Sequence, residues 1–118
     1  GRESRKIELA KLAEKPLNKG VNRIIVQSDL SYPATVFTRS KSGFSKSLKI
    51  GSQEISAFDV PDGEYYQYFT LEKDPKTRHP ISMAPNNPLK KYDPVRLNEN
   101  SILTVTLAFE GARSFPGK

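Results

Sequence analysis

The sequence has no cysteine and no tryptophan, and it contains only one histidine and one methionine. Without thiols, disulfides, thiol catalysis and cysteine-based zinc or iron–sulfur sites are excluded, so packing must stabilise the fold. No stretch approaches the roughly 18 apolar residues that a membrane span needs, and no charged and then apolar signal segment opens the sequence. We therefore expect a soluble protein, and the start at Gly1 leaves open whether a signal peptide or anchor precedes it.

Residues suited to catalysis or metal binding are few and scattered. His79 lies in a proline-rich stretch far from the densest carboxylates, so nothing local would position it as a general base. No serine lies in a Gly-x-Ser-x-Gly or comparable catalytic setting. Asp59, Asp62 and Glu64 come closest to a cation site, but they flank a turn and lack the spacing of calcium loops. The sequence therefore predicts a protein that is not an enzyme and has no metal and no cofactor.

The 118 residues can close one hydrophobic core but not two, so we expect a single domain over residues 1–118. Helix formers before Pro16 predict a short helix in residues 1–20, although Ile7 and Leu9 alternate well enough to admit a strand. Further along, blocks of branched and aromatic residues predict short strands. These blocks are Val21–Val26, Ala34–Thr38, Lys46–Ile50, Gln53–Phe58, Glu64–Glu72 and Ser101–Phe109.

The shortest connection between two of these blocks is Gly51-Ser52. Glycine at the first central position is what a two-residue type II′ hairpin turn requires, because that position needs a positive φ. The sequence therefore predicts a hairpin in which Lys49 faces Glu54 and Leu48 faces Ile55.

The last third of the sequence combines a proline-rich stretch with a regular strand pattern. Five prolines between Asp74 and Pro94 predict a long Pro-rich loop, residues 74–94, which we expect to be functional or mobile. The final block alternates apolar residues with threonines, a pattern typical of an antiparallel strand with one wet face. Together the elements predict a mostly β fold, an antiparallel β-sandwich or a small barrel with a short N-terminal helix.

The stretch IGSQEISAFDVPDGEYY, which begins at Ile50, resembles a recurring phrase of bacterial extracytoplasmic β-sandwich modules of the PEGA and carboxypeptidase-regulatory-like kinds. In those modules a hairpin leads to an apolar residue, a Pro-x-Gly turn and a tyrosine that opens the next strand. The phrase covers residues 50–66 of the chain. The resemblance implies a sandwich and a location in the bacterial cell envelope, and it carries over no functional residue.

Positive charge is the most informative part of the composition. Nineteen lysines and arginines against thirteen acids give a net charge of +6, which favours contact with polyanions, although many basic proteins have no such site. One basic group comprises Arg39, Lys41, Lys46 and Lys49, with no acid among them. These cations either pair with the acids that follow on a neighbouring strand or form a contact surface. A second group, with Lys90, Lys91 and Tyr92, is either a single-stranded nucleic acid groove or an ordinary solvated loop.

Aromatic residues occupy both faces of the predicted strand Glu64–Glu72. If Tyr65 and Phe69 face the core, Tyr66 and Tyr68 lie on the outer face, where exposed tyrosines commonly contact proteins or glycans. The alternative is a strand buried on both faces.

The leading hypothesis is a non-catalytic binding or assembly module, bacterial and secreted or in the cell envelope (periplasm or cell surface), that contacts a protein or an anionic envelope polymer. The alternative is a cytoplasmic nucleic-acid-binding β-barrel. Neither the ligand nor the oligomeric state can be derived from the sequence. The candidate binding residues are Tyr66, Tyr68, Arg39, Lys41, Lys46, Lys90, Lys91 and Tyr92.

Overall fold

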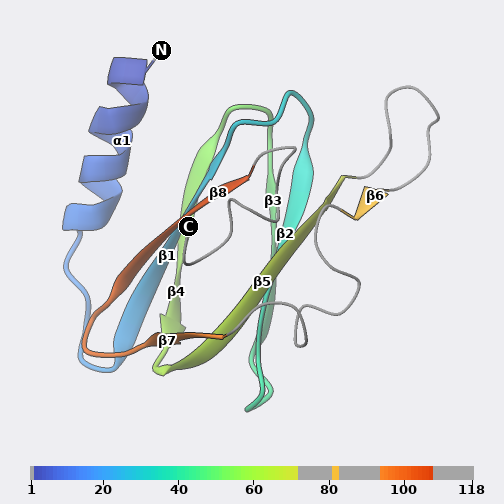
Figure 1. Ribbon diagram of the computed structural model, residues 1–118. Helices are drawn as coiled ribbons and strands as arrows, with labels where there is room; N and C mark the ends of the chain where they lie inside the picture. The colour runs from blue at the N-terminus through green and yellow to red at the C-terminus, as the bar shows by residue number, and fades with distance from the viewer. Residues whose placement is uncertain (1, 72–80, 83–93, 108–118) are drawn as a thin grey trace.

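The computed structural model describes residues 2–71, 81–82 and 94–107, which form two β-sheets packed face to face with one helix outside them (Figure 1). The helix is α1 (Arg2–Glu14). The first sheet has the strand order β4-β1-β8, with β1 (Val21–Ser28), β4 (Ile55–Pro61) and β8 (Ile102–Leu107). The second has the order β3-β2-β5-β6, with β7 also on β5; its strands are β2 (Ala34–Ser40), β3 (Ser45–Ile50), β5 (Gly63–Leu71), β6 (Ile81–Ser82) and β7 (Val95–Leu97).

The predicted fold class is confirmed: the protein is mostly β, with a short N-terminal helix. Of the two architectures expected, the described strands adopt the sandwich and do not close into a barrel. The hydrophobic core lies between the two sheets, where alternate residues of each strand point inward. Fully buried core side chains include Ile24, Val26, Val36, Phe69 and Val105.

Strand β1 is buried on both faces, which explains its continuous apolar run. Ile24 and Val26 face the second sheet, whereas Ile25 faces the opposite side and is also buried. Helix α1 lies on that outer side, against β1 and β4. A central strand covered on both faces needs consecutive rather than alternating apolar residues.

The predicted hairpin across Gly51-Ser52 is wrong. Strand β3 pairs with β2, whereas β4 pairs with β1 in the other sheet, so the register partner of Lys49 is Thr35 rather than Glu54. Gly51 does not adopt a positive φ; Gln53 does, at 60°. The pairing of β3 with β2 and of β4 with β1 prevails over the β3–β4 pairing that the short turn alone would favour.

Hydrogen bonds hold this sheet-to-sheet crossing in place. Glu54 N donates to Gly51 O (3.2 Å), and Gly51 N donates to the Glu54 carboxylate (2.5 Å). Ser52 Oγ and Gln53 Nε2 both donate to Leu30 O (3.1 Å each), which ties the crossing to the β1–β2 connection.

The strand pattern near the C-terminus is right, but its predicted direction is wrong. Val105 and Leu107 are buried and Thr104 is exposed, as the alternation predicts, yet β8 runs parallel to β1. Alternation reports one wet face and contains no information on strand direction. Most of the predicted Pro-rich loop, residues 74–94, lies outside the described residues, but β6 falls within it and pairs with β5, contrary to the expectation of no regular structure.

Tyr65 fixes the second crossing between sheets, where Pro61 ends β4 and Gly63 begins β5. Its hydroxyl donates to Pro61 O (2.6 Å), and its ring lies edge-on to Phe44, with ring centroids 5.6 Å apart. Burial raises the pKa of the Tyr65 hydroxyl, and the negative charge of Asp62 raises it further.

Replacing Tyr65 by phenylalanine should lower the free energy of unfolding at neutral pH by about 1 kcal/mol, because the hydrogen bond to Pro61 O is lost. Since the pKa of Tyr65 is raised on folding, this hydroxyl stabilises the protein fully below pH 10, the ordinary tyrosine value, and less as pH rises through the raised pKa. The stability difference between wild type and Tyr65→Phe should therefore narrow above pH 10 in urea titrations. A constant difference would contradict this account.

Gly51→Ala tests the corrected crossing. An added Cβ would lie 2.6 Å from Glu54 Oε1 and 2.9 Å from Glu54 Cδ, so the Glu54 side chain must move, but no positive φ opposes alanine. We expect a cost of about 1 kcal/mol in the wild type and less than about 0.5 kcal/mol in a Glu54→Ala background. Equal costs in both backgrounds, measured by urea unfolding, would show that backbone strain is responsible.

Candidate functional site

The β2–β3 hairpin forms one edge of the sandwich and carries the first basic group. Ser40 N donates to Phe44 O (3.0 Å), and Gly43 in the turn has a φ of 107°, a conformation that favours glycine. The four cations of this hairpin are all exposed: Arg39 on β2, Lys41 in the turn, and Lys46 and Lys49 on β3. The structure thus places three predicted site residues, Arg39, Lys41 and Lys46, on one hairpin, with Arg39 and Lys46 on opposite faces of the sheet.

The acids that follow in the sequence are engaged elsewhere. Asp59 pairs with Arg23 (2.9 Å), and Glu64 pairs with Arg96 (2.9 Å). Glu54 accepts a hydrogen bond from Gly51 N. Asp59 and Glu64 thus have ion-pair partners outside the hairpin, and the predicted register with Lys49 opposite Glu54 is not formed.

Lys46 occupies the opening between the two sheets. Its register partner Thr38 is fully buried, so Lys46 starts from the inner face of the second sheet, but its position on an edge strand leaves it exposed. The ammonium lies 5.7 Å from the ring centroid of Phe58 on β4, within range of a cation–π interaction. The lysine therefore covers apolar surface with its stem while its charge remains accessible.

The tyrosine surface predicted on β5 is not present at Tyr66, whose side chain is 3% exposed. Tyr65 and Tyr66 point to opposite faces of β5 and both are buried, so the alternative of burial on both faces holds at this position. The side chain of Tyr68 lies outside the described part of the structure. Lys90, Lys91 and Tyr92 lie outside the described residues.

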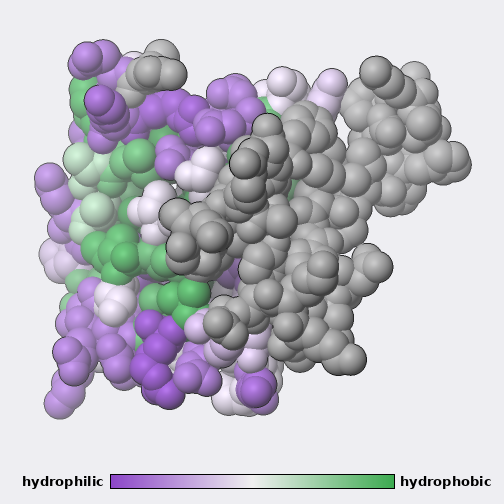
Figure 2. Space-filling view, in the orientation of Figure 1, coloured by the Kyte–Doolittle hydropathy of each residue, from purple (hydrophilic) through white to green (hydrophobic). Residues whose placement is uncertain are grey.

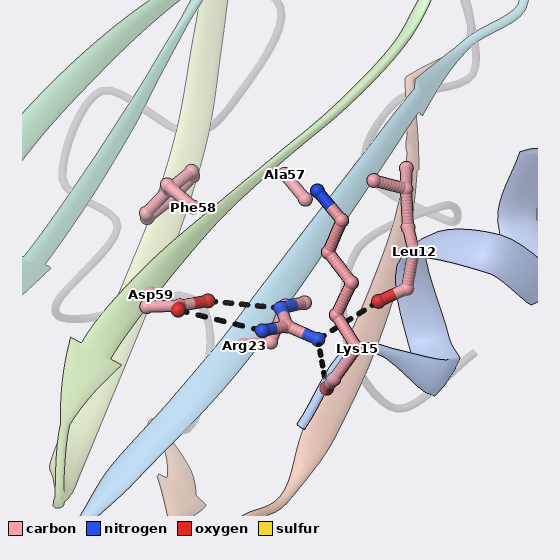
Figure 3. A pocket seen from close by; sticks show the side chains of 6 residues that line it. All are labelled: Leu12, Lys15, Arg23, Ala57, Phe58 and Asp59. Carbon is pink, nitrogen blue, oxygen red and sulfur yellow. Dashed lines mark hydrogen bonds and ion pairs between the residues drawn. The ribbon is translucent and has the colours of Figure 1, made fainter. Parts of the chain in front are cut away.

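A buried arginine that the sequence analysis did not single out fastens α1 to the sheet (Figure 3). Arg23 on β1 is 5% exposed, and its Nε and Nη2 donate to the two carboxylate oxygens of Asp59 (2.9 and 3.4 Å). Its Nη1 donates to the carbonyls of Leu12 and Lys15 at the C-terminal end of the helix (2.8 and 2.7 Å). A guanidinium in this position satisfies helix carbonyls that have no partner of their own. An arginine within a buried apolar strand is the signal that could have revealed it, since a buried charge needs partners.

A pocket of about 240 Å³ lies between α1 and β4, lined by Leu12, Lys15, Arg23, Ala57, Phe58 and Asp59. All four hydrogen bonds of Arg23 within the described residues are made to the protein itself, so this cation stabilises the fold rather than serving a ligand. Figure 2 shows apolar surface where the lower end of α1 meets the first sheet, between hydrophilic side chains above and below. Apolar packing of the helix is therefore incomplete, and polar contacts hold it.

Two further findings concern metals and membranes. Within residues 2–71, 81–82 and 94–107 there is no group of three or more histidine, aspartate or glutamate side chains that could hold a metal ion. In the same part of the chain, no helix has the length and apolar character needed to cross a membrane.

Comparison with known proteins gave no match: no family model, no curated protein and no solved structure is similar to this chain.

Arg23→Met should destabilise the protein by about 2–4 kcal/mol, because it removes a buried charge that ties a carboxylate and two helix carbonyls together. Amides of α1 should then exchange faster than those of β1 and β2. The matched control is Arg5→Met, which also removes one arginine from α1–β1 contacts. It breaks a more exposed ion pair with Asp29 and hydrogen bonds to Gln27 Oε1 and Ser28 O, and it should cost less than Arg23→Met, about 1 kcal/mol. Equal costs for the two variants, measured by urea unfolding, would refute the role assigned to Arg23.

Proposed function

We propose that this chain is a non-catalytic binding module that holds an acidic partner on its β2–β3 hairpin. The observation that supports this is the segregation of charge: the hairpin carries exposed Arg39, Lys41, Lys46 and Lys49 and no acid. Cations concentrated on one edge create a local positive potential that attracts and orients an anionic partner. The partner that we favour is a protein; an anionic polymer of the cell envelope is the other candidate.

The hairpin is suited to this task because it is both rigid and accessible. Strand β2 lies between β3 and β5, with seven register pairs to β5, so the hairpin is held by a paired sheet. Lys46 and Lys41 are exposed and take part in no ion pair among the described residues. Each exposed contact contributes little by itself, so affinity should come from several charges acting together and should depend on salt.

A bacterial, extracytoplasmic location belongs to the same proposal. It is supported by the phrase that begins at Ile50, which resembles envelope modules. Binding of single-stranded nucleic acid is the alternative; its predicted groove, with Lys90, Lys91 and Tyr92, lies outside the described residues.

Reversing two charges of the hairpin tests the proposal. Lys41→Glu with Lys46→Glu should weaken binding of fluorescent poly-glutamate at least about tenfold at low salt, because two attractive contacts become repulsive. The matched control is Lys6→Glu with Lys11→Glu on α1, which changes the net charge by the same amount and should weaken binding far less. Titrations across a salt series give the affinities.

If the two double variants lose affinity equally, binding reflects net charge and the hairpin is not the site. Teichoic acid and a single-stranded oligonucleotide, titrated in parallel, decide the partner class. Tighter binding of either one than of poly-glutamate at physiological salt would replace the acidic protein with that polymer.

A further inference from the structure

Among the described strands, β3 pairs with β2 alone, so no described strand covers its other edge. The hydrogen-bonded pair formed by Ser40 and Phe44 fixes which groups lie on that edge. In an antiparallel ladder such pairs recur at every second residue, here at Lys46 and Leu48 of β3. The N–H and C=O groups of Ser47, which lies between them, therefore point away from β2.

The side chains along this edge leave room for another strand. Ser45 and Ser47 are small, polar and exposed, and their register partners on β2 are Arg39 and Phe37. Neither serine hydroxyl covers its own backbone by a hydrogen bond within the described residues. An open edge of this kind presents donors and acceptors in the spacing that an extended peptide matches.

Charge determines which strand can use the edge. Lysine on an edge strand disfavours pairing with a second copy of the same strand, because like charges would then lie opposite each other. An acidic strand experiences the reverse effect: carboxylates opposite or diagonal to Lys46, with others near Lys41 in the turn, gain favourable cross-strand contacts. The same two lysines thus exclude one occupant and favour another.

We infer that β3 binds an extended acidic segment of a partner protein as an additional strand of the second sheet. This inference rests on the proposed function, since it specifies how the acidic partner is held. Main-chain hydrogen bonds to Ser45 and Ser47 contribute affinity, and the lysines contribute selectivity.

The test uses a ten-residue fluorescent peptide of alternating glutamate and valine, and a second peptide N-methylated at its two central residues. Methylation removes a donor from each edge of the peptide and keeps its charge. On the protein, Ser47→Pro removes the outward N–H at a position where an edge strand tolerates proline, and Ser47→Ala is the matched control. We expect the unmodified peptide to bind wild type and Ser47→Ala alike, and methylation or Ser47→Pro to weaken binding at least about tenfold.

The outcomes separate this inference from the proposed function. If Lys41→Glu with Lys46→Glu weakens binding but methylation and Ser47→Pro do not, acidic partners bind the hairpin through charge alone and strand addition is overturned. If methylation weakens binding but charge reversal does not, strand addition stands and the basic hairpin is not the selective element. Because the methylated peptide leaves the protein unchanged, a folding defect in Ser47→Pro cannot be mistaken for evidence of strand addition.

Discussion

The crossing at Gly51–Glu54, which moves the chain from one sheet to the other, is the constraint on which the rest of the structure depends. Strands β3 and β4 are consecutive in the sequence but lie at the edges of different sheets. They therefore do not pair with each other. The crossing also places Asp59, an acid that follows the basic hairpin, on β4 in the other sheet. There Asp59 engages Arg23, which holds α1 against the first sheet. One short connection thus determines the position of β3 at the end of its sheet and the anchoring of the helix.

The positions of the main strands could be predicted from the sequence, but several of their partners could not. Local runs of branched and aromatic residues identify segments such as Ala34–Ser40, because burial in a sheet imposes the pattern residue by residue. Pairing depends on contacts between distant segments, so the turn residues Gly51 and Ser52 suggested a hairpin that tertiary packing does not form. The parallel pairing of β8 with β1 joins residues about 80 positions apart and leaves no local signature.

The candidate site was partly visible in the sequence for the same reason. Counting charges locates the basic group, but only the fold shows that Lys46 reaches out between the sheets over Phe58. The burial of Tyr66 could not be predicted from the alternation of side chains along β5, because that pattern does not show whether other residues cover the outer face. The Arg23 contacts with Asp59 and the helix carbonyls need elements that are separate in the sequence to come together, so composition alone could not predict them.

Amide hydrogen exchange along β3 tests the central claim most directly, since it reports both the pairing with β2 and the state of the open edge. In the free protein, Lys46 and Leu48 amides should exchange slowly, because they donate to β2, and Ser45 and Ser47 amides should exchange fast. On adding the glutamate–valine peptide, Ser45 and Ser47 should become protected. Exchange at Ser47 that is already slow in the free protein, or that stays fast at saturating peptide, would contradict the account.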